Sequence, residues 1–142
     1  MDNFISTSTI VINAPANKVW QTLTTPELAK QYLFGSDVTA DWRVGGAITY
    51  AGMWEGKKFE DKGTILTLEP NKQLTTTHFS PLSGKEDKPE NYHTVSYTLD
   101  EDAGKTTVTL TQDNNETQEE ADHSTQNWNM ALESLKKVVE SL

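Results

Sequence analysis

Six strand-like segments between residues 37 and 113 fall into three successive pairs, and a linker of only four or five turn-forming residues separates the two members of each pair. Strands joined by so short a linker pair antiparallel, because a parallel partner requires a crossover of about a dozen residues or more. The sequence therefore predicts an antiparallel sheet made of consecutive hairpins. The predicted pairs are Asp37–Trp42 with Ala47–Ala51, Gly63–Glu69 with Leu74–Ser80, and Tyr92–Asp100 with Thr106–Asp113.

The last of these pairs indicates that one face of the sheet is buried. Val95, Tyr97 and Leu99 alternate with polar residues, and Val108 and Leu110 alternate with threonines on the partner strand. A period of two places the apolar side chains on one face of the sheet and the polar ones on the other. The apolar face is therefore expected to pack against another element.

The segment before the hairpins predicts one strand and two short helices. Residues Phe4–Ile12 are rich in β-branched side chains, which favour a strand. Pro15 suits the first position of a helix, where its missing N–H group costs nothing. Thr25 and Pro26 suit the N-cap and the first residue of a second helix.

The stretch that begins at Thr117 predicts a long C-terminal helix. Thr117 and Glu120 have the spacing of a capping box, which satisfies free N–H groups at the start of a helix. Apolar residues then recur at helical spacing to the end of the chain, so the helix can cover the buried face of the sheet. This apolar face comprises Trp128, Ala131, Leu132, Leu135, Val138, Val139 and Leu142.

Small residues occupy the same face nearer the start of this helix. They are Ala121, Ser124 and Thr125. A helix packed on a sheet along its whole length would be expected to carry larger apolar residues there. We interpret the small side chains as a sign of open space, which predicts a cavity beside the first half of the helix.

Length and charge limit the classes of function. A chain of 142 residues fits a single domain spanning residues 1–142. The formal net charge of -9 argues against nucleic acid or an anionic membrane as the main partner. No stretch approaches the ~20 apolar residues of a membrane span, and the N-terminus lacks the pattern of a signal peptide. We therefore expect a cytoplasmic protein.

No motif in the chain predicts a catalytic group, a metal or a cofactor. The absence of cysteine excludes a disulfide framework, a thiolate zinc site and a cysteine nucleophile. Gly45 and Gly46 match neither a dinucleotide fingerprint nor a P-loop, and they suit the positive φ angles of a tight turn. His78, His93 and His123 lie far apart and lack the local spacing of a metal site.

The segment Ser80–Asn91 separates the second pair of strands from the third. It is polar and interrupted by proline and glycine, which predicts a long surface loop. Such a loop is either a lid over a binding site or a plain connection.

Four segments of the chain are similar to the START/Bet v 1-like superfamily, also called SRPBCC. They are INAPANKVWQTLTTPE, DWRVGGAITY, GTILTLEPNKQL and NWNMALESLKKVVESL, and they occur in the expected order. Within the superfamily the chain resembles the branch related to the C-terminal domain of the heat-shock protein 90 ATPase activator. We expect no counterpart here of that activator's large N-terminal chaperone-binding domain.

The resemblance implies an α+β helix-grip fold. In this fold a curved antiparallel sheet grips the long C-terminal helix and usually leaves a cavity between them. Members of the superfamily bind lipids, hormones or polyketides, some are enzymes, and the chaperone activator works through protein contacts. The fold alone does not choose among these functions.

We expect a binding protein for a small, largely apolar molecule, held between the sheet and the first half of the helix. The first alternative is a protein-interaction module with a chaperone or another protein as partner. The second is a cofactor-independent enzyme that uses a histidine or a carboxylate as general base. The expected cavity walls are Trp42, Tyr50, Phe59, Phe79, Tyr97, Gln112, Ser124 and Trp128.

Overall fold

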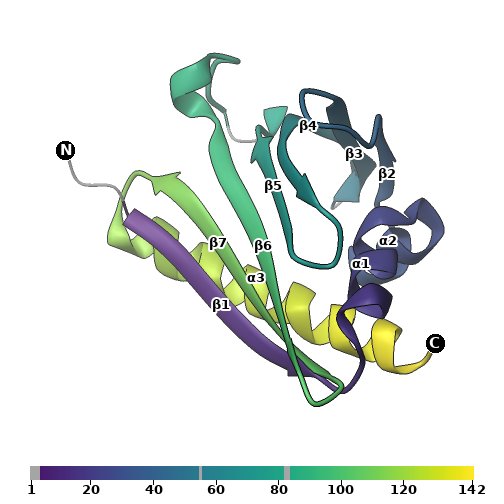
Figure 1. Ribbon diagram of the computed structural model, residues 1–142. Coiled ribbons are helices and arrows are strands. Elements are labelled where there is room, and N and C mark those ends of the chain that lie inside the picture. Colours follow the sequence, from purple (N-terminus) through teal and green to yellow (C-terminus); the bar gives the residue numbers. More distant parts are fainter. Residues whose placement is uncertain (1–3, 55, 82–83) are drawn as a thin grey trace.

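The computed structural model describes residues 4–54, 56–81 and 84–142 and shows the predicted α+β helix-grip fold. Seven antiparallel strands form one sheet in the order β1-β7-β6-β5-β4-β3-β2, and the long helix α3 lies across one of its faces (Figure 1). The elements are β1 (Phe4–Ile12), α1 (Ala16–Thr24), α2 (Pro26–Tyr32), β2 (Asp37–Ala40), β3 (Ala47–Trp54), β4 (Lys57–Glu69), β5 (Gln73–His78), the 3-10 helix η2 (Pro89–Asn91), β6 (His93–Asp102), β7 (Lys105–Asn115) and α3 (Gln118–Glu140).

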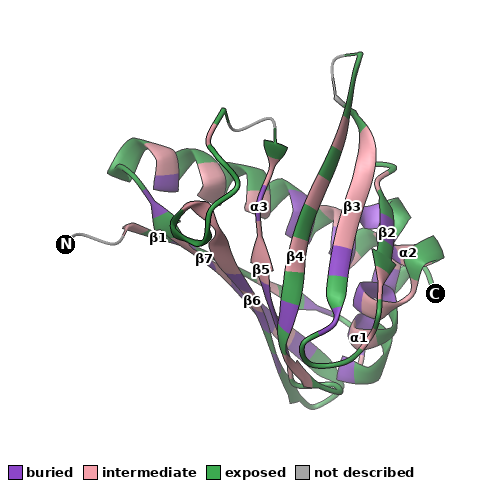
Figure 2. Ribbon diagram, turned by 90° about the horizontal axis from the view of Figure 1, so that it is seen from above, coloured by how far each residue is buried: buried purple, intermediate pink, exposed green. Residues whose placement is uncertain are grey.

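The three predicted hairpins are present as β2–β3, β4–β5 and β6–β7. A fourth hairpin joins β3 to β4, because β3 continues to Trp54 and β4 already begins at Lys57. The sequence did not predict these extensions, since the glycines and lysines of this region have low strand propensity. Pairing between the two strands supplies the missing stability, and Figure 2 shows the hairpin reaching beyond its neighbours with largely exposed and half-buried residues.

Gly52 makes room for an aromatic ring inside this hairpin. It pairs with Phe59 on β4, and a Cβ atom built on Gly52 would lie 3.0 Å from the Phe59 ring. A larger residue at position 52 would therefore push the ring away. Glycine in the interior of a strand commonly marks such a close approach.

The two glycines of the turn before β3 are needed for different reasons. Gly45 has a φ of +86°, as the turn prediction requires. Gly46 does not have a positive φ, so the expectation of a left-handed backbone there is wrong. A Cβ atom on Gly46 would instead lie 2.1 Å from the carbonyl oxygen of Asp41, and only glycine allows so close an approach.

Helix α3 begins at the predicted cap. The Thr117 side chain accepts a hydrogen bond from the Glu120 N–H group over 3.0 Å. The Glu120 carboxylate in turn accepts from the N–H group of Glu116, one residue earlier than a reciprocal capping box requires. The predicted apolar face is buried or half-buried as far as Val139, but Leu142 is 48% exposed, because the helix ends at Glu140.

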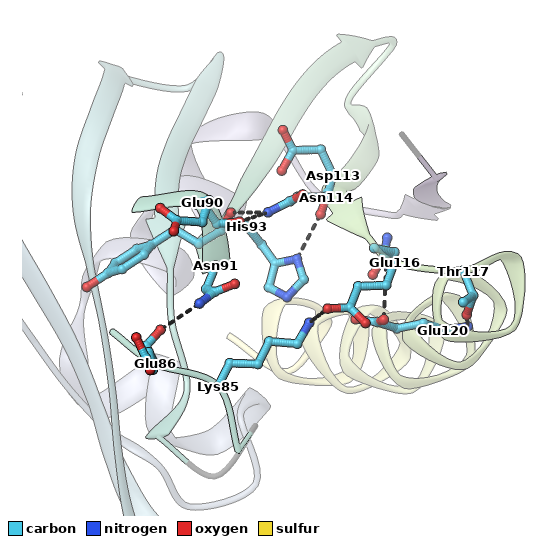
Figure 3. A network of polar contacts seen from close by, with 12 residues as sticks. Lys85, Glu86, Glu90, Asn91, His93, Asp113, Asn114, Glu116, Thr117 and Glu120 are labelled. Carbon is cyan, nitrogen blue, oxygen red and sulfur yellow. Dashed lines mark hydrogen bonds and ion pairs between the residues drawn. The ribbon is translucent and has the colours of Figure 1, made fainter. Parts of the chain in front are cut away.

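Polar contacts attach the segment after β5 to the end of β7 and to the turn before α3 (Figure 3). Lys85 forms an ion pair with Glu116 at 2.7 Å. The Asn114 side chain donates to the carbonyl oxygen of Glu90 at 2.8 Å. Residues 82–83 of the predicted loop Ser80–Asn91 lie outside the described residues. The contacts of the remainder favour a connection over a lid.

Candidate functional site

A partly open pocket of about 240 Å³ lies where the middle of α3 faces strands β3 to β6 and the loop after α2. Six of its lining residues are apolar or aromatic, namely Leu33, Tyr50, Phe59, Val95, Tyr97 and Trp128. Four are polar, namely Ser36, Asp61, Thr76 and His78. Its volume falls just below the range of about 300–1,000 Å³ that is usual for ligand pockets. Its occupant would therefore be a small molecule.

The Trp128 side chain is held in place on the α3 side of this pocket. Its indole Nε1 donates a hydrogen bond to Oε1 of Gln112 over 2.7 Å. Its ring meets that of Tyr97 edge to face, with ring centroids 6.4 Å apart and an interplanar angle of 83°. Both contacts fix the ring as a rigid wall, because they act on different parts of the indole.

Gln112 belongs to a buried polar network that joins α3 to the sheet. Its amide Nε2 donates to Oδ1 of Asn115 and to Oγ of Ser124, at 3.2 and 3.4 Å. Asn115 Nδ2 in turn donates to the carbonyl oxygen of Phe4 at 2.9 Å. Gln112 and Asn115 are only 8% and 2% exposed, so these polar groups depend on one another for their hydrogen bonds.

Three tyrosines contribute neutral hydroxyl groups in and around the pocket. The hydroxyl oxygens of Tyr32 and Tyr97 lie 3.3 Å apart. Burial raises the pKa of Tyr97 to about 12, and it also raises the pKa of Tyr32 and of Tyr50. The phenols therefore keep their protons at neutral pH and remain available as hydrogen-bond donors.

One histidine–carboxylate pair lies among the polar lining residues. His78 Nε2 is 3.0 Å from Asp61 Oδ2, and the two side chains are 24% and 17% exposed. The ring of Tyr50 contacts the His78 ring edge-on, with centroids 5.9 Å apart. The other two histidines lie elsewhere: His93 Nδ1 bonds the carbonyl group of Asp113, and His123 is exposed on α3.

Four of the eight predicted wall residues meet at the pocket, namely Tyr50, Phe59, Tyr97 and Trp128. Gln112 and Ser124 lie behind Trp128 in the polar network. Trp42 follows the end of β2 and packs against the core. Phe79 stacks on Tyr92 with ring centroids 5.1 Å apart and does not line the pocket. That any of these residues binds a ligand stays a prediction.

The inference from small residues to open space beside the start of α3 is wrong. Ala121 is 1% exposed, and its carbonyl group accepts a hydrogen bond from Ser6 Oγ at 2.8 Å. Ser8 Oγ donates in the same way to the carbonyl group of Thr125 at 3.3 Å. The small side chains of α3 face small side chains of β1, so helix and strand pack closely here.

The alternation of side chains along β5 contained a signal for His78, a lining residue that was not among the predicted walls. Thr76 pairs directly with Val95, and His78 is two residues farther along β5, on the same face as Thr76. Because side chains alternate along a strand, His78 and its neighbour Phe79 point to opposite faces. A correct choice of face would have selected His78 in place of Phe79. The contribution of Leu33 and Ser36 depends on loop geometry and had no such signal.

Within the described residues, no group of three or more histidine, aspartate or glutamate side chains is placed to hold a metal ion. None of the helices in the same residues is long and apolar enough to cross a membrane.

Residues 13–140 match the family model of the Activator of Hsp90 ATPase homolog 1-like protein. The solution structure of ChR145 from Cytophaga hutchinsonii is 50% identical in sequence, and the match covers 99% of this chain and 97% of that chain with a TM-score of 0.86. The Aha1 dimer from Colwellia psychrerythraea is 26% identical over 99% of this chain and 97% of that chain, with a TM-score of 0.75.

DynU16, from the dynemicin biosynthetic locus, is 18% identical and shares the fold, with a TM-score of 0.80 over 96% of this chain and 47% of that chain. A search of the curated proteins finds no significant match.

Proposed function

The chain belongs to the Activator of Hsp90 ATPase homolog 1-like family, and we propose that it is a cytoplasmic binding protein for a small, largely apolar molecule. The observation that carries this proposal is the partly open pocket of about 240 Å³ between α3 and the sheet. Its walls are mostly aromatic and aliphatic, with a few convergent polar groups, which is the usual composition of a ligand pocket. Rigid walls such as Trp128 lower the entropic cost of binding.

Native mass spectrometry of the protein, purified gently from its own organism, tests this proposal directly. A retained ligand would appear as added mass. Its loss under mild denaturation would show that it is bound noncovalently to the folded protein. A species with the bare mass of the chain, together with no uptake of any apolar probe, would contradict the proposal.

A variant that fills the pocket provides a second test, and a variant with the same new ring outside the pocket is its matched control. Ser36 is half-buried in the pocket wall, whereas Thr39 is exposed on β2. Ser36→Phe should reduce the uptake of an apolar fluorescent probe, because the new ring occupies the space of the ligand. Thr39→Phe adds the same ring outside the pocket and should bind the probe as the wild type does. Equal loss in both variants would show that the probe binds elsewhere.

The family match favours a protein-interaction module as the second candidate function. An exposed apolar side chain also favours this function, since Phe34 is 71% exposed two residues after the end of α2. Stimulation of chaperone ATPase activity by this chain, with loss of that stimulation in Phe34→Ser, would support it. No change in ATPase rate at saturating concentrations would contradict a chaperone-activating role.

The His78–Asp61 pair favours a cofactor-independent enzyme as the third candidate. A histidine whose ring is oriented by a carboxylate can act as a general base when its other nitrogen faces a substrate. The ligand recovered from the native protein decides this point. Its conversion to a new mass on incubation with wild type, but not with His78→Gln, would establish catalysis.

A further inference from the structure

One oxygen of the Asp61 carboxylate is buried without a hydrogen bond. Among the described residues, Oδ1 of Asp61 is the one buried side-chain nitrogen or oxygen atom without a partner. We propose that the molecule bound in the pocket carries a hydroxyl or amino group, and that this group donates a hydrogen bond to Asp61 Oδ1. This inference rests on the proposed binding function and names the chemical class of the ligand.

The carboxylate is fixed in its position by its surroundings. Asp61 pairs with Tyr50 of β3, and His78 Nε2 holds Oδ2 at 3.0 Å. With one oxygen held by His78, the other cannot turn toward a different donor without breaking this contact. For this hydrogen bond His78 is a positioning residue, because it orients the Asp61 carboxylate that accepts from the ligand.

A buried carboxylate oxygen needs a donor. An ionised carboxylate can only accept hydrogen bonds, and leaving one of its oxygens buried and unpaired is unfavourable. In the described part of the chain no donor reaches Oδ1, although Tyr50 and Thr76 line the same pocket. The most direct source of a donor is the molecule that occupies the pocket.

The lining residues away from Asp61 indicate the chemistry of the rest of the ligand. Leu33, Phe59, Val95 and Trp128 offer only apolar or aromatic surface, apart from the indole N–H group, which already bonds Gln112. The ligand therefore has an apolar body of one or two rings and a donor at one point of its edge. A site built around a buried acceptor rejects analogues that lack the donor more strongly than an apolar wall rejects a change of one methyl group.

Four probes of similar size test this inference by titration calorimetry. They are 2-naphthol, 2-(aminomethyl)naphthalene, 2-methoxynaphthalene and 2-methylnaphthalene. Wild type should bind the naphthol or the amine about tenfold or more tightly than the ether and the hydrocarbon, because a hydrogen bond to a charged group is a strong one. The preferred donor probe separates an alcohol-type ligand from an amine-type ligand.

Substitutions at Asp61 and His78 test whether the preference for donor probes depends on the Asp61 carboxylate. Asp61→Val should bind 2-methylnaphthalene as well as wild type does and should lose the preference for the donor probes. Glu60→Val removes the same charge from the adjacent, exposed position of β4 and should keep the preference. His78→Gln can still donate to Oδ2 and should largely retain the preference, whereas His78→Phe should reduce it.

The outcomes are distinguishable. Binding of all four probes with equal affinity by wild type overturns this inference and leaves the proposed function standing. A preference that survives in Asp61→Val overturns it as well. If wild type takes up none of the probes, the inference fails. If it also shows only the bare mass of the chain in native mass spectrometry, the proposed binding function fails with it. The wild-type series is decisive by itself, even if Asp61→Val does not fold.

Discussion

The indole N–H group of Trp128 donates to Oε1 of Gln112 over 2.7 Å and thereby connects the wall of the pocket to the buried network of β7 and α3. Gln112→Leu removes the acceptor and both amide donors, so it leaves the Trp128 N–H group without its partner. We expect a loss of about 1–3 kcal/mol in the free energy of unfolding and weaker uptake of an apolar probe. Gln126→Leu on the exposed side of α3 should change stability by less than about 0.5 kcal/mol. Chemical denaturation of both variants measures the difference, and similar values would contradict a role for the network.

Asparagine substitutions distinguish the two reasons for glycine in the turn before β3. Asparagine tolerates a left-handed backbone, so Gly45→Asn should be nearly neutral. Gly46→Asn places a Cβ atom against the Asp41 carbonyl group and should cost about 1–3 kcal/mol. Thermal unfolding of both variants gives the comparison. Equal stabilities would show that the backbone at Asp41 can move away.

Leu135 lies on the continuous buried face of α3 and is 0% exposed. Leu135→Ala should reduce the free energy of unfolding by about 2–5 kcal/mol through loss of apolar contact and a residual cavity. Glu133→Ala on the exposed side should cost well under ~1 kcal/mol. Urea denaturation measures both, and comparable effects would mean that the buried face has been assigned wrongly.

Close packing between α3 and β1 predicts that larger side chains are not tolerated there. Ala121→Leu inserts three carbon atoms beside Ser6 and should cost about 1–3 kcal/mol by overpacking. Asp122→Leu is exposed on the same turn and serves as the control. An Ala121→Leu protein as stable as wild type would indicate spare space, as the sequence analysis expected.

Alkaline pH should destabilise the protein through its buried tyrosines. Burial raises the pKa of Tyr97 to about 12, against about 10 in an unfolded chain. Between about pH 10 and pH 12 the unfolded chain loses this proton while the folded protein keeps it, so the free energy of unfolding falls as pH rises. Tyr97→Phe should make this fall shallower. Urea denaturation across the interval checks it, and an unchanged slope in the variant would contradict the assignment.

The sheet, the hairpins and the long helix could be predicted because local signals agreed with the tertiary structure. The alternation at Val95, Tyr97 and Leu99 and the cap at Thr117 indicate the same elements that are observed. The extension of β3 and β4 could not be predicted. Residues such as Gly52 on β3 and Lys58 on β4 have low strand propensity and are in strands only because the two strands pair with each other.

The pocket was predictable in kind but not in place. Aromatic residues such as Tyr50 and Trp128 do line it. The small residues near Ala121, however, result from close packing of α3 on β1 and do not border open space. A small side chain fits both situations, and only the size of the residue across from it distinguishes them. Asp61 carried no sequence signal at all, because its meeting with His78 depends on how β4 and β5 are placed side by side.

The contact between Ser6 and Ala121 holds the first turns of α3 close to β1. Trp128 lies seven residues farther along α3, about 10 Å away along the helix axis. We expect bulkier residues at this contact to tilt α3 and to move Trp128 away from Tyr97 on the sheet. The volume that the pocket offers is therefore set partly by two small side chains that its occupant does not touch, and a change of selectivity can arise there while every wall residue stays the same.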